Sequence, residues 1–282
     1  MDGVLLINKP IDYTSRDIVN VLSKKFSERK AGHTGTLDPF ASGLMVLTFG
    51  KATKISSFLE ATDKTYVAEL TLGVSTDTLD LTGNIIETKD VIMPGIQELE
   101  KIFNSFLGEI EQIPPMYSAI KINGEELYKK ARRGEVVERK ARKIKIHSIR
   151  ILSIVKNKIL FEVSCSKGTY IRTLGKDIAD KIGCGGHLSL LTRTSVGNFD
   201  LRMAKNLDNV CENDVISITK ALEFLPTFTL NSALEKKARN GVKLFLENQK
   251  SERLFLKNIN NEPIAIYELK EDGYYYSLRG LF

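Results

Sequence analysis

Strand-like and helix-like segments follow one another along this chain without a regular strand–helix–strand repeat, and this order restricts the fold more than any other feature. Two alternating apolar runs, residues 145–155 and 158–165, are joined only by Lys156 and Asn157, which predicts a β-hairpin. Helical spacing of apolar residues predicts helices over 14–26, 96–106 and 171–182. The sequence therefore favours an α+β fold, a largely antiparallel mixed sheet flanked by helices.

Other segments complete this prediction. Strands are expected at 4–7, 44–49, 64–73 and 188–196, with a further strand beginning at 116–121. Additional helices are expected at 51–59, 125–133 and 215–224. Thr14 and Asp17 have the spacing of a capping box at the start of the first helix, and Gly183 follows the helix over 171–182 as a stop signal.

The length of 282 residues favours two domains, and Pro226 is the predicted boundary. Residues 1–225 would form the larger domain. Residues 226–282 read as a short helix over 232–240 followed by strands at 253–257, 263–269 and 274–278. A β-rich module of this size is expected to gain stability by docking on the larger domain.

Composition excludes several classes of protein. A hydrophobic content of 42% with 27% charged residues is typical of a globular chain, and no apolar run is long enough for a membrane helix. No signal peptide is recognisable, so a cytoplasmic protein is expected. The three cysteines and three histidines are dispersed, which argues against a disulfide framework or a metal site. The glycines near 43–51 and 183–186 lack the spacing of nucleotide-binding loops, so no cofactor is predicted.

Positive charge is concentrated in one segment. Residues 121–145 contain ten lysines and arginines against four glutamates, an excess equal to the net charge of the whole chain, +6. A local surplus on an otherwise balanced protein indicates a polyanionic partner, and RNA or DNA is the first candidate.

Residues 32–39, Gly-His-Thr-Gly-Thr-Leu-Asp-Pro, place one carboxylate in a constrained turn. By itself such a turn is more often an Asx turn than a catalytic centre. Asp77 and Asp80 could approach Asp38 in space, which leaves a two-carboxylate hydrolase open. Arg172 could pair with Asp38 and keep it ionised and oriented.

Seven short sequence blocks occur in the same order as in one protein family, and they favour a catalytic role for Asp38. Residues 32–44 resemble the signature of the TruB family of bacterial tRNA pseudouridine-55 synthases, and the resemblance extends over about residues 3–225. The other blocks are residues 7–10, 52–54, 64–66, 114–119, 166–172 and 183–188. The resemblance implies the pseudouridine synthase fold, and residues 226–282 are loosely similar to the family's small, PUA-like RNA-binding module.

The resemblance also implies roles for individual residues. Asp38 would be the essential carboxylate, Arg172 would pair with it, and Tyr66 would stack on the target base and later remove its C5 proton. The implied substrate-binding residues are His33, Tyr170, Leu191, Lys9 and Lys54. The basic insertion at about 121–145 is expected to grip RNA phosphates through Arg132, Arg133, Arg139 and Arg142.

The implied reaction converts a uridine of the tRNA T-loop, at position 55, into pseudouridine. The expected partner is the T-arm of tRNA, and the enzyme is expected to act as a monomer without cofactor, metal, membrane or obligatory protein partner. Two alternatives remain: a non-catalytic RNA-binding protein that assists tRNA folding, and a carboxylate-based hydrolase.

Overall fold

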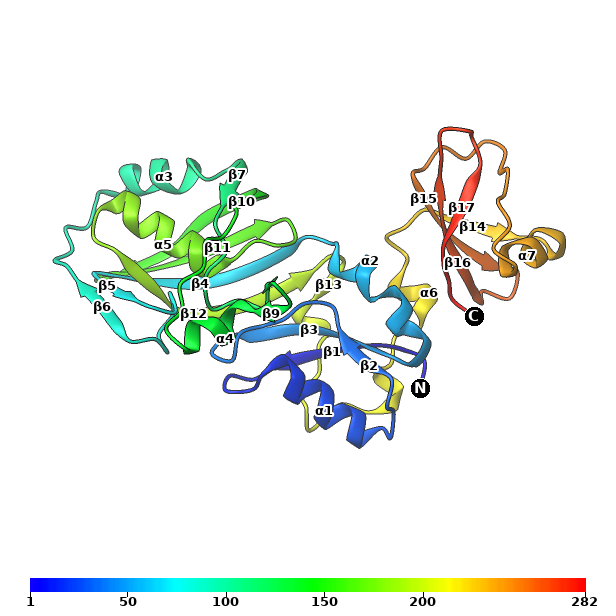
Figure 1. The fold of residues 1–282 in the computed structure, drawn as a ribbon, viewed down its shortest axis with the longest axis horizontal. Coiled ribbons are helices and arrows are strands. Elements are labelled where there is room, and N and C mark those ends of the chain that lie inside the picture. Colours follow the sequence, from blue (N-terminus) through cyan, green and yellow to red (C-terminus); the bar gives the residue numbers. More distant parts are fainter.

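The computed structural model describes all residues from 1 to 282, and its main feature is a nine-stranded mixed sheet (Figure 1). The strand order is β1-β3-β12-β4-β11-β10-β7, with β2 beside β3 and β13 beside β12. The strands are β1 (Gly3–Lys9), β2 (Ala31–His33), β3 (Ser42–Phe49), β4 (Lys64–Leu72), β7 (Gly108–Gln112), β10 (Arg142–Val155), β11 (Lys158–Cys165), β12 (Gly186–Val196) and β13 (Phe199–Asp200). All pair antiparallel except β3 and β12, which confirms the predicted α+β class.

The helices are short and cover parts of this sheet. The α-helices are α1 (Ser15–Lys25), α2 (Ser56–Glu60), α3 (Ile96–Asn104), α4 (Leu127–Arg132), α5 (Ile171–Ile182), α6 (Ile218–Ala221) and α7 (Ser232–Arg239). The 3₁₀ helices are η1 (Gly50–Ile55), η2 (Leu201–Met203) and η3 (Glu212–Asp214). No helix has the length and hydropathy needed to cross a membrane.

Three predicted local features, a capping box, a helix end and a hairpin turn, are present in the structure. The capping box forms, because the backbone N–H of Asp17 donates to Thr14 Oγ1 and the Asp17 carboxylate accepts from the backbone of Thr14. Helix α5 ends at Gly183, whose φ of 96° is left-handed. The β10–β11 hairpin turns at Lys156 and Asn157, with Lys156 at a φ of 54°.

Both faces of the β1–β3 pair are buried, which explains their continuous apolar runs. Leu5 of β1 belongs to the large hydrophobic cluster that includes α1, whereas its neighbour Val4 belongs to a second cluster on the other face. Because successive side chains of a strand point to opposite faces, each residue of the run packs against a different layer. This burial fixes β3, the strand that follows the Asp38 turn.

Several predicted elements are shorter than the sequence indicates. Residues 51–59 form η1 and α2 instead of one helix, and the expected helix over 215–224 is the single turn α6. Residues 116–120 are irregular, and β8 (Lys121–Ile122) pairs with β9 (Glu125–Glu126) before α4 begins. The turn at Asn123 and Gly124, both at positive φ, forms this small hairpin and delays the helix.

Residues after Pro226 form a separate four-stranded sheet at one end of the molecule, coloured orange to red in Figure 1. Its strands are β14 (Thr227–Leu230), β15 (Arg253–Asn258), β16 (Pro263–Leu269) and β17 (Tyr275–Gly280). One face builds its own apolar cluster with α7, while Phe255, Ile266 and Leu281 join the cluster that contains Val4. The small sheet is therefore docked on the large one.

A further two-stranded sheet, β5 (Val74–Thr76) with β6 (Ile85–Thr88), extends from the end of β4. Its turn carries Asp77 and Asp80, the two carboxylates that, from the sequence, could approach Asp38.

Candidate active site

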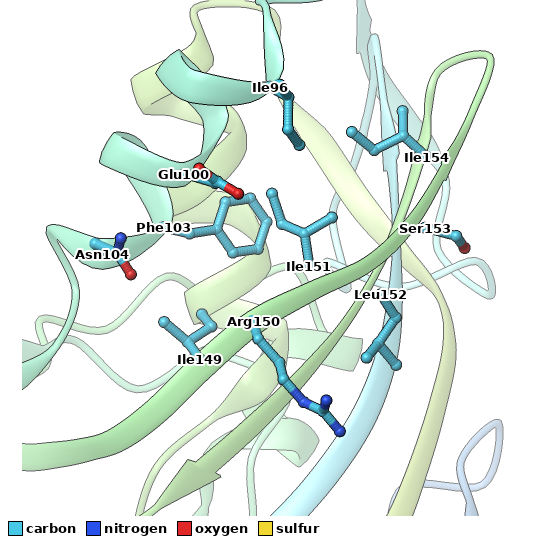
Figure 2. Close-up of a pocket in the computed structure, with 10 residues that line it drawn as sticks. All are labelled: Ile96, Glu100, Phe103, Asn104, Ile149, Arg150, Ile151, Leu152, Ser153 and Ile154. Atoms are coloured by element: carbon cyan, nitrogen blue, oxygen red, sulfur yellow. The ribbon is translucent and has the colours of Figure 1, made fainter.

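Several hollows on the main domain could hold a small ligand. The first, of about 370 Å³, lies between α3 and β10 (Figure 2). Phe103 and Ile151 face one another there, and Arg150 points away from the hollow and pairs with Glu162 at 2.9 Å. This hollow holds one carboxylate, Glu100, and no arrangement of reactive groups.

The second hollow is a cleft of about 740 Å³ that contains Asp38. Its walls come from the turn 35–38, from β4 and β12, from the start of α5 and from the segments 118–120, 142–144 and 166–170. Segments far apart in the sequence thus meet around one carboxylate. The cleft is large enough for a nucleotide base, and we take it as the candidate active site.

Buried polar groups hold the backbone of the Asp38 turn in place. Leu37 donates its backbone N–H to Ser15 Oγ at 2.8 Å, and Ser15 Oγ donates back to the Leu37 carbonyl oxygen at 3.1 Å. Lys9 is fully buried, and its Nζ donates to the carbonyl oxygens of Tyr13 (2.7 Å) and Pro39 (3.3 Å). Burial lowers the pKa of Lys9 to about 8. Lys9 therefore supports the turn and does not line the cleft.

Arg172, in the first turn of α5, grips Asp38 from the opposite wall. Its Nε lies 2.8 Å from Asp38 Oδ2, and its Nη2 donates to Asp38 Oδ1 at 3.1 Å. The remaining donors reach the carbonyl oxygens of Thr78 (2.8 Å) and Tyr117 (2.7 Å) and the carboxylate of Asp80 (3.3 Å). This bidentate geometry fixes both oxygens of Asp38.

Asp80 is a site residue whose role sequence analysis missed. It is 4% exposed and accepts hydrogen bonds at Oδ1 from Thr78 Oγ1, Thr82 Oγ1 and the Thr82 backbone N–H. Its other oxygen binds Arg172, so the two carboxylates share one guanidinium. Asp77 instead accepts from Asn84. Sequence analysis named Asp80, with Asp77, only as a carboxylate that could approach Asp38, and nothing in the sequence of this turn indicated that Asp80 would bind Arg172.

The sheet register sets the floor of the cleft. Tyr66 of β4 lies opposite Arg193 of β12, and Ala68 lies opposite Leu191, so all four side chains share one face. Tyr66, Leu191 and Arg193 line the cleft, and each is less than a tenth exposed. Arg193 was not predicted as a site residue; an arginine within the apolar alternation of 188–196 is the signal that could have identified it.

Tyr170 precedes α5 and lines the cleft at its rim. Its backbone is clamped by Gln112, which accepts from the Tyr170 N–H at 2.8 Å and donates to its carbonyl at 3.0 Å. His33 and Lys54 do not line the cleft. His33 Nδ1 accepts from the Gly35 N–H at 3.3 Å, and Lys54 Nζ donates to the Phe282 carbonyl at 2.8 Å.

The four predicted RNA-binding arginines differ in their surroundings. Arg142 lines the cleft, and Arg132 lies over the ring of Tyr128, 5.5 Å from its centroid. Arg133 is bound by Glu125 (2.6 Å) and Glu135 (2.7 Å). Arg139 donates to the carbonyl oxygens of residues 114 and 137.

Burial acts on the titrating groups of the cleft. It raises the pKa of Asp38, and the Arg172 guanidinium opposes this rise. Burial also raises the pKa of the Tyr66 phenol, against the opposing charge of Arg193. No group of three or more histidine, cysteine, aspartate or glutamate side chains is arranged to hold a metal ion.

Comparison with known proteins identifies the family of this chain. Residues 23–171 match the family described as TruB family pseudouridylate synthase (N terminal domain), and residues 172–223 match the tRNA pseudouridylate synthase B C-terminal domain. The chain therefore belongs to the TruB family of pseudouridylate synthases.

Individual relatives cover nearly the whole chain. The tRNA pseudouridine synthase B of Alkaliphilus oremlandii is 45% identical over 87% of this chain and 83% of its own length. The tRNA pseudouridine synthase B of Bacillus subtilis is 43% identical over 95% and 93%, respectively. The expected family membership is confirmed.

Solved structures share the fold. A chain of the crystal structure of a Cbf5–Nop10–Gar1 complex is 26% identical, with a TM-score of 0.73, over 95% of this chain and 78% of that one. A chain of an H/ACA RNP bound to a substrate RNA containing 2′-deoxyuridine has a TM-score of 0.75 at 23% identity, over 99% and 85%. The second likeness shows the common fold.

Proposed function

We propose that this protein isomerises a uridine of the tRNA T-loop, at position 55, to pseudouridine. The observation that carries the proposal is the bidentate Asp38–Arg172 pair in a cleft floored by Tyr66 and Leu191, in a chain of the TruB family. The relatives named tRNA pseudouridine synthase B support tRNA as the substrate.

The reaction breaks the bond between N1 of uracil and C1′ of ribose and forms a bond between C5 and C1′. One proton leaves C5 and one arrives at N1, so the reaction is redox-neutral and consumes no co-reactant. A single ionised carboxylate is sufficient to start it, as nucleophile at C1′ or C6 or as base at C2′. Asp38, whose ionised form is favoured by the Arg172 guanidinium against the effect of burial, takes this role.

The target base must leave its stack to reach Asp38. Flipping costs a few kcal/mol, which stacking on aromatic rings and contacts to phosphates offset. Tyr66 on the floor and Tyr170 at the rim supply aromatic surfaces, and Leu191 adds an apolar side chain to the floor. The closed floor holds the detached uracil until it is reattached.

The remaining surfaces are assigned to tRNA binding. Residues 1–225 would form the catalytic domain, with the basic segment 121–145 against the phosphates of the T-arm, and residues 226–282 would form an RNA-binding, PUA-like module. The proposal includes action as a monomer without an obligatory protein partner. The proposal places the enzyme in the cytoplasm, where its substrate is.

The test replaces the carboxylate by its neutral isostere. Asp38→Asn should lower pseudouridine formation on a tRNA transcript by more than about 10²-fold while folding and tRNA binding persist. Product is measured by carbodiimide labelling and by tritium release from C5-labelled uridine. Full turnover of the variant would refute the catalytic role of Asp38. Binding without product by the wild type would favour the RNA-folding alternative, and release of free base would favour a hydrolase.

A further inference from the structure

Arg193 is a buried cation that touches the Asp38 turn. The residue is 2% exposed, and its guanidinium donates to the carbonyl oxygens of Leu44 (2.8 Å), Gly35 (3.1 Å) and Thr36 (3.5 Å). Gly35 and Thr36 precede Asp38 in the turn, and Leu44 belongs to β3, which follows it. One side chain from β12 therefore ties together both ends of the segment that carries the carboxylate.

The strand pairing makes this approach possible. Gly43 lies opposite Arg193 in the only parallel pairing of the large sheet, at a φ of 106°. A Cβ at position 43 would lie 2.4 Å from the Arg193 carbonyl oxygen and 2.7 Å from its nitrogen. The close backbone contact brings β12 against the Asp38 segment.

The charge of Arg193 has no partner of opposite sign. Arg193 forms no ion pair: it donates to neutral carbonyl oxygens and lies beside the Tyr66 phenol, whereas Arg172 in the same cleft is neutralised by Asp38 and Asp80. A buried cation without an anion is costly. The arrangement is favourable where a negative charge develops nearby during a reaction.

Tyr66 is the group beside Arg193 that can acquire this charge. The two residues are direct cross-strand partners on the face that lines the cleft. The guanidinium opposes the effect of burial on the pKa of the phenol. No other residue of the cleft floor has a titrating oxygen.

We propose that Arg193 is a positioning residue of the isomerisation: it fixes the turn that carries Asp38 and stabilises the negative charge of the Tyr66 oxygen that accepts the C5 proton. This inference rests on the proposed function and on Tyr66 as the proton acceptor. Tyr66 first releases its phenolic proton to solvent, and the negative charge that develops on its oxygen is stabilised by Arg193. The phenolate then takes the proton from C5, the electrons of the C5–H bond form the C5=C6 double bond, and the electron pair of the C6=N1 double bond moves to N1, which takes a proton from solvent.

The experiment compares single-turnover rates on tRNA that carries uridine or 5-deuterouridine, across a range of pH. The variants are Arg193→Gln, which removes the charge, and Arg193→Lys, which keeps it without the three-way hydrogen bonding. Arg202→Gln is the matched control, because Arg202 is exposed and pairs only with Asp200. Circular dichroism and tRNA binding report whether each variant is folded.

Arg193→Gln should slow product formation by about 10²-fold and raise the deuterium isotope effect. Because loss of the positive charge disfavours the phenolate, the rise in rate that accompanies ionisation of Tyr66 should move to higher pH. Arg193→Lys should retain a profile nearer to that of the wild type at a reduced rate. Arg202→Gln should match the wild type.

Two outcomes would overturn the inference. One is a wild-type rate in Arg193→Gln. The other is a slower rate in both variants with the isotope effect and pH profile unchanged, which would mean that Arg193 supports the fold alone. If Arg193→Gln does not fold, the lysine variant decides: a wild-type rate in Arg193→Lys, which lacks the three hydrogen bonds to Gly35, Thr36 and Leu44, contradicts the proposed positioning role. Absence of product with the wild type would instead refute the proposed function.

Discussion

At the scale of single residues, the cleft is governed by two carboxylates on one guanidinium. Asp38 is one-third exposed at its side chain and is the group that a substrate can reach, while Asp80 is buried behind Arg172. The negative charge of Asp80 raises the pKa of Asp38, and the positive charge of Arg172 lowers it. Asp80 therefore orients Arg172, while its negative charge makes ionisation of Asp38 less favourable.

This balance predicts opposite pH shifts for two substitutions. Catalysis requires ionised Asp38, so activity should rise as pH increases through its pKa. Asp80→Asn should move this acid limb to lower pH, by about one unit or less, and reduce the rate because Arg172 loses an anchor. Arg172→Gln should move it to higher pH. Single-turnover pH profiles measure both, and shifts of the same sign would contradict the network.

At the scale of elements, the segment 121–145 combines a small hairpin, α4 and the start of β10. Its ten cations are not equivalent, because Glu125 and Glu135 neutralise Arg133 within the segment. Arg142 lines the cleft, and Arg132 is paired with no carboxylate in the segment. Free cations release counterions when they meet phosphates, whereas paired ones must first break an ion pair.

Arg132→Ala combined with Arg142→Ala should therefore weaken tRNA binding by about tenfold and flatten its dependence on salt by about two charges. Arg133→Ala serves as the control and should change affinity less. Filter binding at several salt concentrations provides the measurement. Equal losses in the control and the double variant would argue against selective use of the free cations.

At the scale of the whole molecule, the C-terminal sheet is held by one of its two faces. Phe255 and Leu256 are neighbours on β15, yet Phe255 packs in the cluster shared with the large domain and Leu256 packs inside the small sheet. Lys54 adds a bond to Phe282 across the same junction. The relative position of the two sheets thus depends on a few residues.

Phe255→Ala should cost about 3–5 kcal/mol and separate the unfolding of the small sheet from that of the large domain. Leu256→Ala, the control, should destabilise the small sheet itself by about 2–5 kcal/mol. Calorimetry and limited proteolysis of residues 241–252 distinguish the two. A single transition with unchanged proteolysis in Phe255→Ala would show that other contacts suffice for docking.

The sequence by itself determined the features that depend on neighbouring residues. The capping box at Thr14, the hairpin turn at Lys156 and the end of α5 at Gly183 follow from local chemistry, and all three are present. The irregular order of elements was sufficient for the α+β class. The family blocks placed Asp38 opposite Arg172, and the structure joins them.

Only the tertiary structure decided which distant groups complete the cleft. Asp80 lies 92 residues from Arg172, and Arg193 lies 158 residues from Gly35, so no local pattern could join either pair. Their contacts depend on the insertion of β12 between β3 and β4 and on the register that sets Arg193 opposite Tyr66. Because a shift of one residue in this register would turn Arg193 to the other face, its role exists only in the folded sheet.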